Sequence, residues 1–376
     1  MSSQKQNLLG LSRNELSRFA EQLGERPYRG NQLFGWLYER GATAFSSMSD
    51  LGKAFRERLE THATIQGIER LAIRTSRHDT TTKFLFALPD GRTVETVLIP
   101  PRSAFRRGDA GLDDEQVRQT LCVSTQVGCP LDCAFCATAT MGFQRNLTAG
   151  EIVDQLLQVR RSTGRRITNI VFMGMGEPLL NYDAVMKAVD IFTHGPGVTA
   201  RRITISTAGW VDGIARLAAE RSRVKLAVSL HSAVDATRRE LMPVGRRFPL
   251  PVLEEALRGY YRQTRRRITF EVIFFDGVND TAPEVGALLK FARRVPCKIN
   301  VIPFHSIAFA APAGLGASLR PSPKTDAIVE QLRQAHLTVM VRSSAGEDIE
   351  GACGQLAVRG ERAHGRPRSA VTTAAP

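Results

Sequence analysis

Two segments near the N-terminus, residues 14–23 and 31–40, repeat apolar residues at the three- and four-residue spacing of amphipathic helices. A basic turn over residues 26–30, which contains a proline and a glycine, separates them. The apolar positions are Leu16, Phe19 and Leu23 in the first segment and Leu33, Trp36 and Leu37 in the second. The pattern predicts a small helical domain at the start of the chain.

The period changes from residue 83 onward, where apolar and polar residues alternate over residues 83–100. Pro89, Asp90 and Gly91 interrupt the alternation and are typical of a turn, so this stretch predicts a β-hairpin. Residues 101–119 are charged and poor in large apolar side chains. We expect them to form an exposed, flexible loop that leads into the main domain.

After residue 119, six short runs rich in β-forming residues alternate with helical patterns. The runs read LCVSTQVG, ITNIVFMGM, RITISTAG, KLAVSLH, ITFEVIFFDG and KINVIPFH. This alternation predicts an α/β fold with a parallel sheet, and an open, partial (β/α)6 barrel is the simplest closure. Thr148 with Glu151, and Thr281 with Glu284, fit capping boxes at the starts of two helices.

These patterns divide the chain into four parts. We expect a helical domain over residues 1–80, the hairpin and charged loop over 81–119, and the α/β domain over 120–358. The tail, residues 359–376, is rich in Arg, Gly, Ala and Thr and is predicted to be disordered.

The chain is basic, with 51 Lys and Arg against 37 Asp and Glu and a formal net charge of +14 at pH 7. Such an excess favours a polyanionic partner, although a solvated basic surface would give the same composition. No apolar run approaches the roughly twenty residues of a membrane helix, and the N-terminus lacks the apolar core of a secretory signal. We therefore expect a cytoplasmic protein that does not enter a membrane.

Four of the six cysteines lie between Cys122 and Cys136, which indicates metal or redox chemistry rather than a disulfide framework. Cys129, Cys133 and Cys136 share one loop with the C-x3-C-x2-C spacing typical of the radical S-adenosylmethionine superfamily. Three thiolates would leave one iron of a [4Fe-4S] cluster open to a small molecule. The alternative is a zinc site, completed by Cys122 or a distant histidine, in a non-catalytic RNA-binding protein.

Small or polar residues follow four of the predicted strands, and function in such barrels gathers at the C-terminal ends of strands. The first strand leads into the cysteine loop, and the next three end in residues 174–178, 206–209 and 229–231. We expect these groups to meet at one edge of the sheet.

Several stretches extend the pattern far beyond the cysteine motif: GERPYRGNQLFGWLY, VETVLIP, LCVSTQVGCPLDCAFCATATMGFQRNLTAGEI, FMGMGEPLLN, ISTAG, AVSLHS, FDGVND and DIEGACGQLA. Over nearly its whole length the chain resembles the RlmN-type methyltransferases that modify C2 of adenine in 23S ribosomal RNA, and more distantly their Cfr-type C8 relatives. The resemblance implies a radical-SAM catalytic domain over 120–358 and an accessory RNA-binding domain over 1–80. It also implies the peptidyl-transferase-centre adenine as substrate, with the adenine that follows the anticodon of tRNAs as a second one to test.

The resemblance implies two further catalytic cysteines, because C2 of adenine is not nucleophilic and cannot attack a methyl donor directly. Cys353 would take a methyl group from one S-adenosylmethionine (SAM), and a second SAM, cleaved by the reduced cluster, would activate that methyl group for addition to C2. Cys122 would then attack the Cys353 sulfur and release the RNA, leaving a disulfide. An external electron donor such as flavodoxin is implied as well, and we expect a monomer.

Further positions match the cofactor contacts of the family. They are Gly176, Glu177, Ser206, Ser229, Leu230 and His231. Glu95 matches the proton acceptor, with Cys122 as its rival, although composition alone would make Glu95 a solvent-facing hairpin residue. His231 would otherwise be read as a structural histidine, and Cys297, which matches no motif, is expected in the core.

Three features depart from the family pattern. Residues 101–119 lengthen a connection, and the loop over 343–346 lacks the basic residue common there. His305 stands where the family usually carries Asn, and since it can still form hydrogen bonds we expect it to replace that contact to the cofactor.

Recognition of RNA has no compact sequence signature. We expect phosphates to be held by arginines such as Arg26, Arg29, Arg201 and Arg202. Two other functions stay open at this point: C8 methylation with the same cysteines, and a metal-stabilised RNA-binding factor without catalysis.

Overall fold

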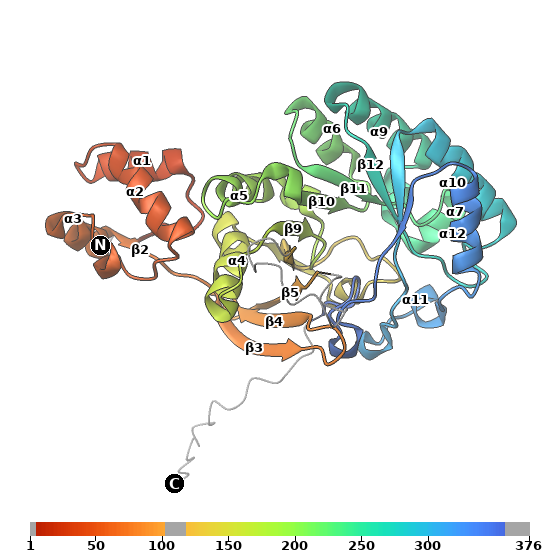
Figure 1. Cartoon of the computed structure of the whole chain (residues 1–376), viewed down its shortest axis with the longest axis horizontal. Coiled ribbons are helices and arrows are strands. Elements are labelled where there is room, and N and C mark those ends of the chain that lie inside the picture. Colours follow the sequence, from red (N-terminus) through yellow and green to blue (C-terminus); the bar gives the residue numbers. More distant parts are fainter. Residues whose placement is uncertain (1–4, 102–117, 358–376) are drawn as a thin grey trace, which may run out of the picture.

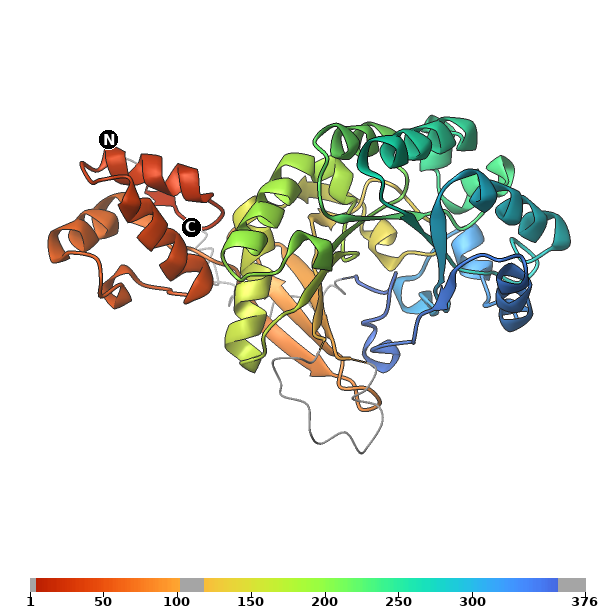
Figure 2. The same cartoon turned by 45° about the horizontal axis from the view of Figure 1, so that its top comes forward.

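The computed structural model describes residues 5–101 and 118–357. A small helical domain begins the chain and lies to one side of the larger α/β domain (Figures 1 and 2). It contains α1 (Arg13–Gln22), α2 (Tyr28–Phe34), which runs on as a wider turn to Glu39, and α3 (Lys53–His62). A parallel pair of two-residue strands, β1 (Gln6–Asn7) and β2 (Ala63–Thr64), joins its ends. The two predicted N-terminal helices are confirmed.

The helical domain docks on α4 (Ala149–Thr163) of the larger domain. A Cβ atom on Gly10 would lie 2.4 Å from the backbone nitrogen of Gly150, so the two backbones can approach only through glycine. Beside them, the buried hydroxyl of Tyr38 accepts the Gly10 N–H at 2.9 Å and donates to the Leu11 carbonyl at 2.9 Å. The two domains therefore share a close-packed junction.

One ten-stranded sheet forms the larger domain, in the order β14-β13-β12-β11-β10-β9-β6-β5-β4-β3. The antiparallel part contains β3 (Glu69–Thr75), β4 (Thr82–Ala87) and β5 (Thr93–Ile99), and β5 pairs antiparallel with β6. The parallel part contains β6 (Thr120–Cys122), β9 (Asn169–Phe172), β10 (Ile203–Thr207), β11 (Lys225–Ser229), β12 (Ile268–Val272), β13 (Cys297–Val301) and β14 (Val339–Val341). The predicted open α/β barrel is confirmed.

Two strands of the ten-stranded sheet were not predicted. The edge strand β3 falls inside the range 1–80 expected to be helical, so the sheet begins before residue 80. All its residues are exposed, Leu71 and Ile73 included, so its place in the sheet depends on its ladder to β4 rather than on burial. The three-residue β14 is too short for a periodic signal, although it leads directly to Arg342.

Helices cover the outer face of the parallel strands (Figures 1 and 2). Besides α4 they are α5 (Tyr182–His194), α6 (Val211–Ala219), α9 (Leu250–Thr264), α10 (Ala282–Arg294) and α12 (Thr325–Gln334), with short α7 (Asp235–Leu241), α8 (Val244–Arg247) and α11 (Leu315–Ser318) in connections. The capping box of Thr148 and Glu151 is present. The one predicted for Thr281 and Glu284 is wrong, because Glu284 instead accepts hydrogen bonds from Ser232 and Thr237.

The hairpin turn around Pro89–Gly91 is confirmed, with the Leu88 N–H donating to the Arg92 carbonyl at 2.7 Å. The expected tail over 359–376 and nearly all of the expected loop over 101–119 lie outside the described residues. In the described part of the chain, no helix is long and apolar enough to cross a bilayer.

Candidate active site

The cysteine loop is closed at its base by an antiparallel pair, β7 (Gln126–Gly128) and β8 (Phe143–Asn146). Gly128 has a φ of +71°, and a Cβ there would lie 1.6 Å from the carbonyl oxygen of Gly142. Only glycine permits this closure. The Cys129 N–H donates to the same carbonyl at 3.1 Å, and the Cys136 N–H donates to the Cys133 carbonyl at 3.1 Å. The loop is therefore held in shape by its backbone.

The three cysteines of this loop lie near one another and are half-buried. Burial raises the pKa of the Cys129 thiol to about 12 and that of Cys133 well above its ordinary value, and negative charge on Cys136 raises both further. Thiols whose pKa is raised in this way still lose their protons when they bind a metal, because the metal stabilises the thiolate. Among the described residues, no three His, Cys, Asp or Glu side chains are arranged to hold a single metal ion. A [4Fe-4S] cubane differs, because it binds its thiolates on separate irons. Three sulfur donors on one loop fit such a cluster.

His231, directly after β11, lies against this loop and carries an unpaired polar atom. Its ring lies 4.3 Å from that of Phe135, and its Nδ1 accepts the Ile273 N–H at 3.1 Å. Burial lowers the pKa of His231 to about 3, so the ring is neutral and Nε2 carries the proton. Buried Nε2 has no partner among the described residues. An orphaned donor in this position fits a cofactor acceptor.

Glu177 ties the turn after β9 to the neighbouring strand end. One carboxylate oxygen accepts the Leu179 N–H at 3.0 Å and the other accepts the Ala208 N–H at 2.8 Å. Burial raises its pKa to about 7. Gly176, at a φ of +100°, packs against Gln126 with no room for a Cβ. The Glu177 carboxylate thus holds the turn after β9 against the end of β10, and it has further lone pairs that can accept a hydrogen bond from a ligand.

The remaining residues predicted to contact the cofactor differ in their burial and in which of their atoms a cofactor could reach. Ser206 and Ser229 are half-buried near the C-terminal ends of adjacent strands β10 and β11. The side chain of Leu230 is fully buried in the core, so only its backbone could meet a cofactor. His305 is buried after β13, with Nδ1 3.2 Å from a carboxylate oxygen of Glu347, but the two atoms lack the alignment of a hydrogen bond.

A cavity of about 920 Å³ opens inside the parallel part of the sheet and contains both remaining cysteines of the predicted site. Strands β6, β12 and β13 each contribute every second residue to the cavity wall, because alternate side chains of a strand point to the same face. Near the strand starts the lining residues are Thr120, Thr204, Lys225, Thr269 and Lys298. Two residues further along lie Cys122, Glu271 and Asn300. Cys353 and Arg342 complete the wall from the C-terminal segment.

Arg342 connects the charged groups of this cavity. Its Nη1 donates to the Cys353 sulfur at 3.1 Å. Burial alone would lower the pKa of Arg342, but negative charge on Cys353, Glu271 and Cys122 raises it overall. Burial and the charge on Cys353 raise the pKa of Cys122 to about 12. Both cysteines are free thiols, and the implied disulfide is not present.

Two buried carboxylates lie in this region. Glu95 pairs with Lys83 at 3.0 Å and accepts the Ala357 N–H at 3.1 Å, and burial raises its pKa against the opposing effect of Lys83. It is therefore not the solvent-facing residue that composition favoured, although it is not among the residues that line the cavity. Glu271 does line the cavity, accepts a hydrogen bond from Asn300 at 2.6 Å, and also has its pKa raised by burial.

Sequence reasoning missed Arg342, Glu271 and Asn300. The detectable signal was a carboxylate in the otherwise apolar strand ITFEVIFF, since a buried charge without a structural reason marks a site. Cys297 is buried in the core as predicted. Arg29 is engaged internally by Glu25 and Tyr28, whereas Arg201 and Arg202 form an exposed turn just before β10.

Comparison with known proteins agrees with this architecture. Residues 6–65 match the family model described as ribosomal RNA large subunit methyltransferase N-terminal domain, and residues 123–292 match the radical SAM superfamily. The chain is 45% identical over 355 residues to the dual-specificity RNA methyltransferase RlmN of Geobacter sulfurreducens, covering 93% of this chain and 91% of that one. It is 44% identical to the RlmN of Syntrophobacter fumaroxidans over 91% of this chain and 95% of that one.

A solved structure is also similar. The radical SAM methyltransferase from Sphaerobacter thermophilus superimposes with a TM-score of 0.81 at 40% sequence identity, covering 93% of this chain and 99% of that one. The likeness includes the N-terminal domain as well as the sheet, because it spans almost the whole of both chains.

Replacing Arg342 with Met should slow alkylation of Cys353 by iodoacetamide at neutral pH by about tenfold. Arg342 donates a hydrogen bond to the Cys353 sulfur at 3.1 Å and so stabilises negative charge on it, and a tenfold change in rate corresponds to about 1.4 kcal/mol. The rate is measured by mass spectrometry of the peptide that contains Cys353. Arg342→Lys keeps the charge and should retain most of the rate, and equal rates in the Met variant and the parent would contradict this role.

Proposed function

The chain belongs to the RlmN family of radical SAM RNA methyltransferases, and we propose that it methylates C2 of an adenine in 23S rRNA and in tRNA. The dual-specificity names of its relatives support both RNA classes. The observation that carries the proposal is the shared cavity of Cys122 and Cys353, next to the three-cysteine loop. A hydrogen bond of 2.7 Å from the Ala137 N–H to the Gly354 carbonyl ties the two cysteine segments together.

Cys129, Cys133 and Cys136 would hold the [4Fe-4S] cluster, and the unpaired Nε2–H of His231 would meet the bound SAM. Backbone or side-chain atoms of Gly176, Glu177, Ser206, Ser229 and Leu230 would complete that contact, with His305 further out. When bound, the reduced cluster supplies the electron that cleaves SAM to a 5′-deoxyadenosyl radical, which removes a hydrogen atom from a methyl group.

The cysteines of the cavity divide the remaining work. The Cys353 thiolate attacks the methyl carbon of SAM, so that a carbon–sulfur bond forms and S-adenosylhomocysteine leaves. After hydrogen abstraction, the same carbon bonds to C2 of adenine, and the adduct loses the C2 proton and one electron, for which the oxidised cluster would be the acceptor. The Cys122 thiolate then attacks the Cys353 sulfur, the bond from that sulfur to carbon breaks, and the released carbon takes up a proton. The resulting disulfide needs an external reductant.

Arg342 would stabilise the thiolate of Cys353 in the first step and the thiolate of Cys122 in the last. The C2 proton needs an acceptor, and burial raises the pKa of both Glu95 and Glu271 toward the range in which a carboxylate can take it. Glu95 has the family match, whereas Glu271 has the position in the cavity wall. Cys122 is the third candidate.

Cationic residues in the cavity wall support a polyanionic substrate. Arg118, Lys225, Lys298, Arg333 and Arg342 line it, against one carboxylate, Glu271. A volume of about 920 Å³ is in the range of a ligand pocket that can take a whole nucleotide. The adenine would be unstacked to reach Cys353. A small electron-transfer protein of the flavodoxin type would deliver electrons, and we propose that the chain acts as a monomer.

The direct test is anaerobic reconstitution with iron and sulfide, followed by incubation with dithionite, SAM and unmodified 23S rRNA or tRNA transcripts. Appearance of 2-methyladenosine together with 5′-deoxyadenosine would support the proposal. Co-elution of the product with 8-methyladenosine would instead assign C8 methylation, and absence of iron, sulfide and any methylated nucleoside would leave an RNA-binding protein.

Replacing Cys353 with Ala should reduce RNA methylation by more than 100-fold while the iron and sulfide content stays unchanged, because Cys353 carries the methyl group but does not bind the cluster. Methylated nucleosides are counted by mass spectrometry and iron by colorimetry. Cys297→Ala, which removes a buried core thiol, is the matched control and should keep activity. Normal methylation by the Cys353 variant would rule out the two-cysteine mechanism.

Replacing Cys122 with Ala should trap the RNA on the protein, because the sulfur that resolves the bond to Cys353 is missing. A covalent adduct would migrate as a slow band in a denaturing gel and disappear on nuclease treatment. The band should also be absent from the Cys122 and Cys353 double variant. Free methylated RNA at the parental rate, without a band, would show that Cys122 does not resolve the intermediate.

A further inference from the structure

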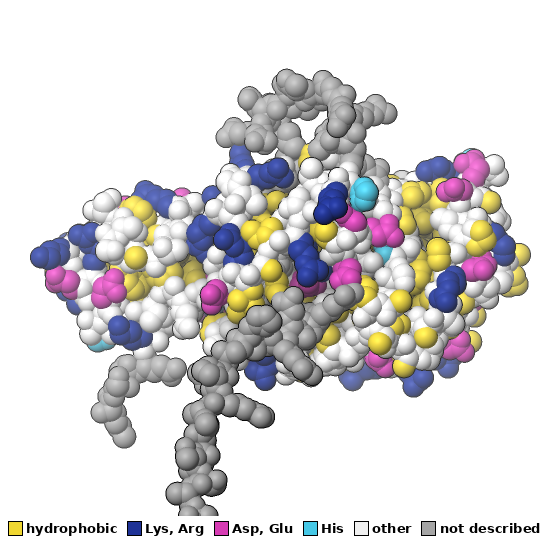
Figure 3. Space-filling model, turned by 90° about the horizontal axis from the view of Figure 1, so that it is seen from below, with side chains coloured by type: hydrophobic (Ala, Val, Ile, Leu, Met, Phe, Trp, Pro, Cys, Tyr) yellow, Lys and Arg dark blue, Asp and Glu magenta, His cyan; other side chains and the backbone are white. Residues whose placement is uncertain are grey.

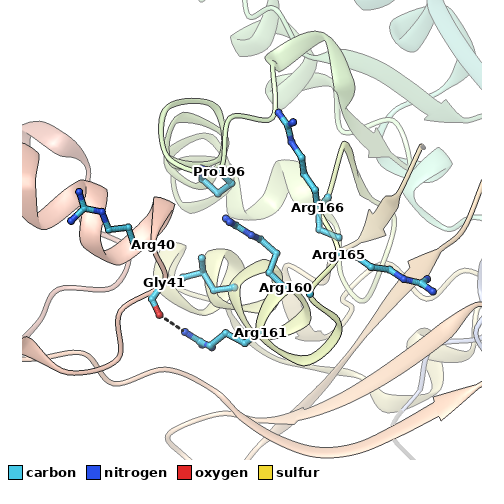
Figure 4. A pocket seen from close by; sticks show the side chains of 10 residues that line it. Arg40, Gly41, Arg160, Arg161, Arg165, Arg166 and Pro196 are labelled. Atoms are coloured by element: carbon cyan, nitrogen blue, oxygen red, sulfur yellow. Dashed lines mark hydrogen bonds between the residues drawn. The ribbon is translucent and has the colours of Figure 1, made fainter. Parts of the chain in front are cut away.

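A second pocket lies on the outside of the molecule, at the junction of the helical domain and α4. It has a volume of about 350 Å³ and is lined by ten residues, of which five are arginines and none is acidic. Arg40 and Gly41 come from the helical domain, and Arg160, Arg161, Arg165 and Arg166 come from the end of α4 and the segment after it (Figure 4). We call this the arginine pocket.

Structural roles account for only some of these arginines. Arg161 pairs with the buried Asp154 at 2.9 Å, and Arg40 lies over Trp36 and 3.6 Å from Asp50. Arg160 donates to the carbonyls of Tyr38 and Glu39, and its place in the last turn of α4 suits the negative end of the helix dipole.

Arg165 and Arg166 have no such explanation. They follow Gly164, which ends the helix in a left-handed conformation, and both side chains are exposed. In the described part of the chain neither has an acidic partner. Burial lowers the pKa of Arg160, and the charge of Arg166 lowers it further, so the cations of the pocket repel one another. An uncompensated cluster of guanidinium groups is the complement of phosphate.

The arginine pocket lies on the same edge of the sheet as those lining residues of the catalytic cavity that are near strand starts, such as Lys225 and Lys298. Arg166 precedes β9, whose neighbours in the sheet are β6 and β10. The approaches to those two strands carry Arg118 and Arg202, and the next strand, β11, begins with Lys225, whose pKa is lowered by burial and by Lys298, Arg118 and Arg202. A row of cations thus runs from the pocket to the cavity wall.

Other parts of the surface are not of one sign. The face in Figure 3 places Lys and Arg beside Asp and Glu and among hydrophobic side chains. The segments that enter β9, β10 and β12, residues 164–168, 195–202 and 265–267, contain arginines and no carboxylate, whereas Glu220 lies before β11. These three segments therefore carry positive charge alone at the strand-start edge.

We propose that the arginine pocket binds phosphates of the RNA substrate outside the target nucleotide, and that the strand-start edge guides the backbone from there to the cavity. The proposal rests on RNA being the substrate and adds where its body is held. Such contacts carry no sequence information, so they suit two RNA classes that share only a target adenine. The pocket also joins both domains, and bound RNA would hold them together.

The test compares Arg165→Gln/Arg166→Gln with Arg239→Gln/Arg246→Gln, which removes two exposed arginines at the opposite, strand-end side. Dissociation constants of reconstituted holoenzyme for 23S rRNA and tRNA transcripts are measured between 0.05 and 0.3 M salt. Each arginine–phosphate pair that is removed should weaken binding roughly 5- to 8-fold at about 0.1 M salt and reduce the salt slope by about 0.7 to 0.9, so loss of both pairs should weaken binding roughly 25- to 60-fold and reduce the slope by about 1.4 to 1.8. The control should bind like the parent.

Methylation of Cys353, measured without RNA, should be unchanged in both variants, which separates docking from chemistry. Parental affinity and salt slope in the Arg165 and Arg166 variant would overturn the proposal, even if the parent methylates RNA. If the parent methylates neither RNA but its RNA binding depends on these arginines, the docking site stands and the proposed function fails. Loss of binding to anionic phosphatidylglycerol vesicles, with the affinity for both RNAs unchanged, would assign the surface to anionic membranes and overturn the proposal.

Discussion

Strand direction is the constraint on which the rest of this molecule depends. Seven strands, β6 and β9 to β14, run parallel in one sheet, so all their C-terminal ends lie at one edge and all their starts at the other. The cysteine loop, the Glu177 turn and His231 follow strand ends, whereas the arginine-rich segments precede strand starts. The proposed radical chemistry and the proposed binding of a polyanion would thereby lie at different edges, and the cavity is lined by residues near both.

Inside that cavity, several buried groups that can carry negative charge lie close together. Cys122 and Cys353, both proposed to act as thiolates, and the buried carboxylate of Glu271 surround the guanidinium of Arg342. Removing one member of such a group leaves a buried charge without a partner. The resulting loss of stability is larger than the stability that the intact pair contributes. Arg342 is therefore placed by β14 with little freedom, and its backbone N–H donates to Val301 at 2.9 Å. The short edge strand missed in the sequence is what positions it.

The sequence predicted features whose signal is local, and missed those set by distant contacts. Helical stripes such as Leu16 and Phe19, the hairpin turn and the cysteine spacing are each contained in a few consecutive residues. Glu284 was misassigned because hydroxyls of Ser232 and Thr237, about fifty residues away, compete for it. The same limit applies to the site. The resemblance indicated Cys353, but no residue close to Cys353 in the chain shows that Glu271 lies in the same cavity.

The charges around the cavity also give the direction from which RNA approaches. Residues 343–352, the loop that carries Cys353 into the cavity wall, contain three carboxylates and no cation. The carboxylates of that loop would repel a polyanion, whereas the edge where Arg118, Lys225 and Lys298 lie would attract it. RNA would therefore enter past the strand starts, with its adenine pointing toward Cys353 and its backbone on the row of arginines. The Cys353 loop lacks the basic residue that is common in the family. RNA entry would not require a cation there, because the cations at the strand-start edge would bind the RNA.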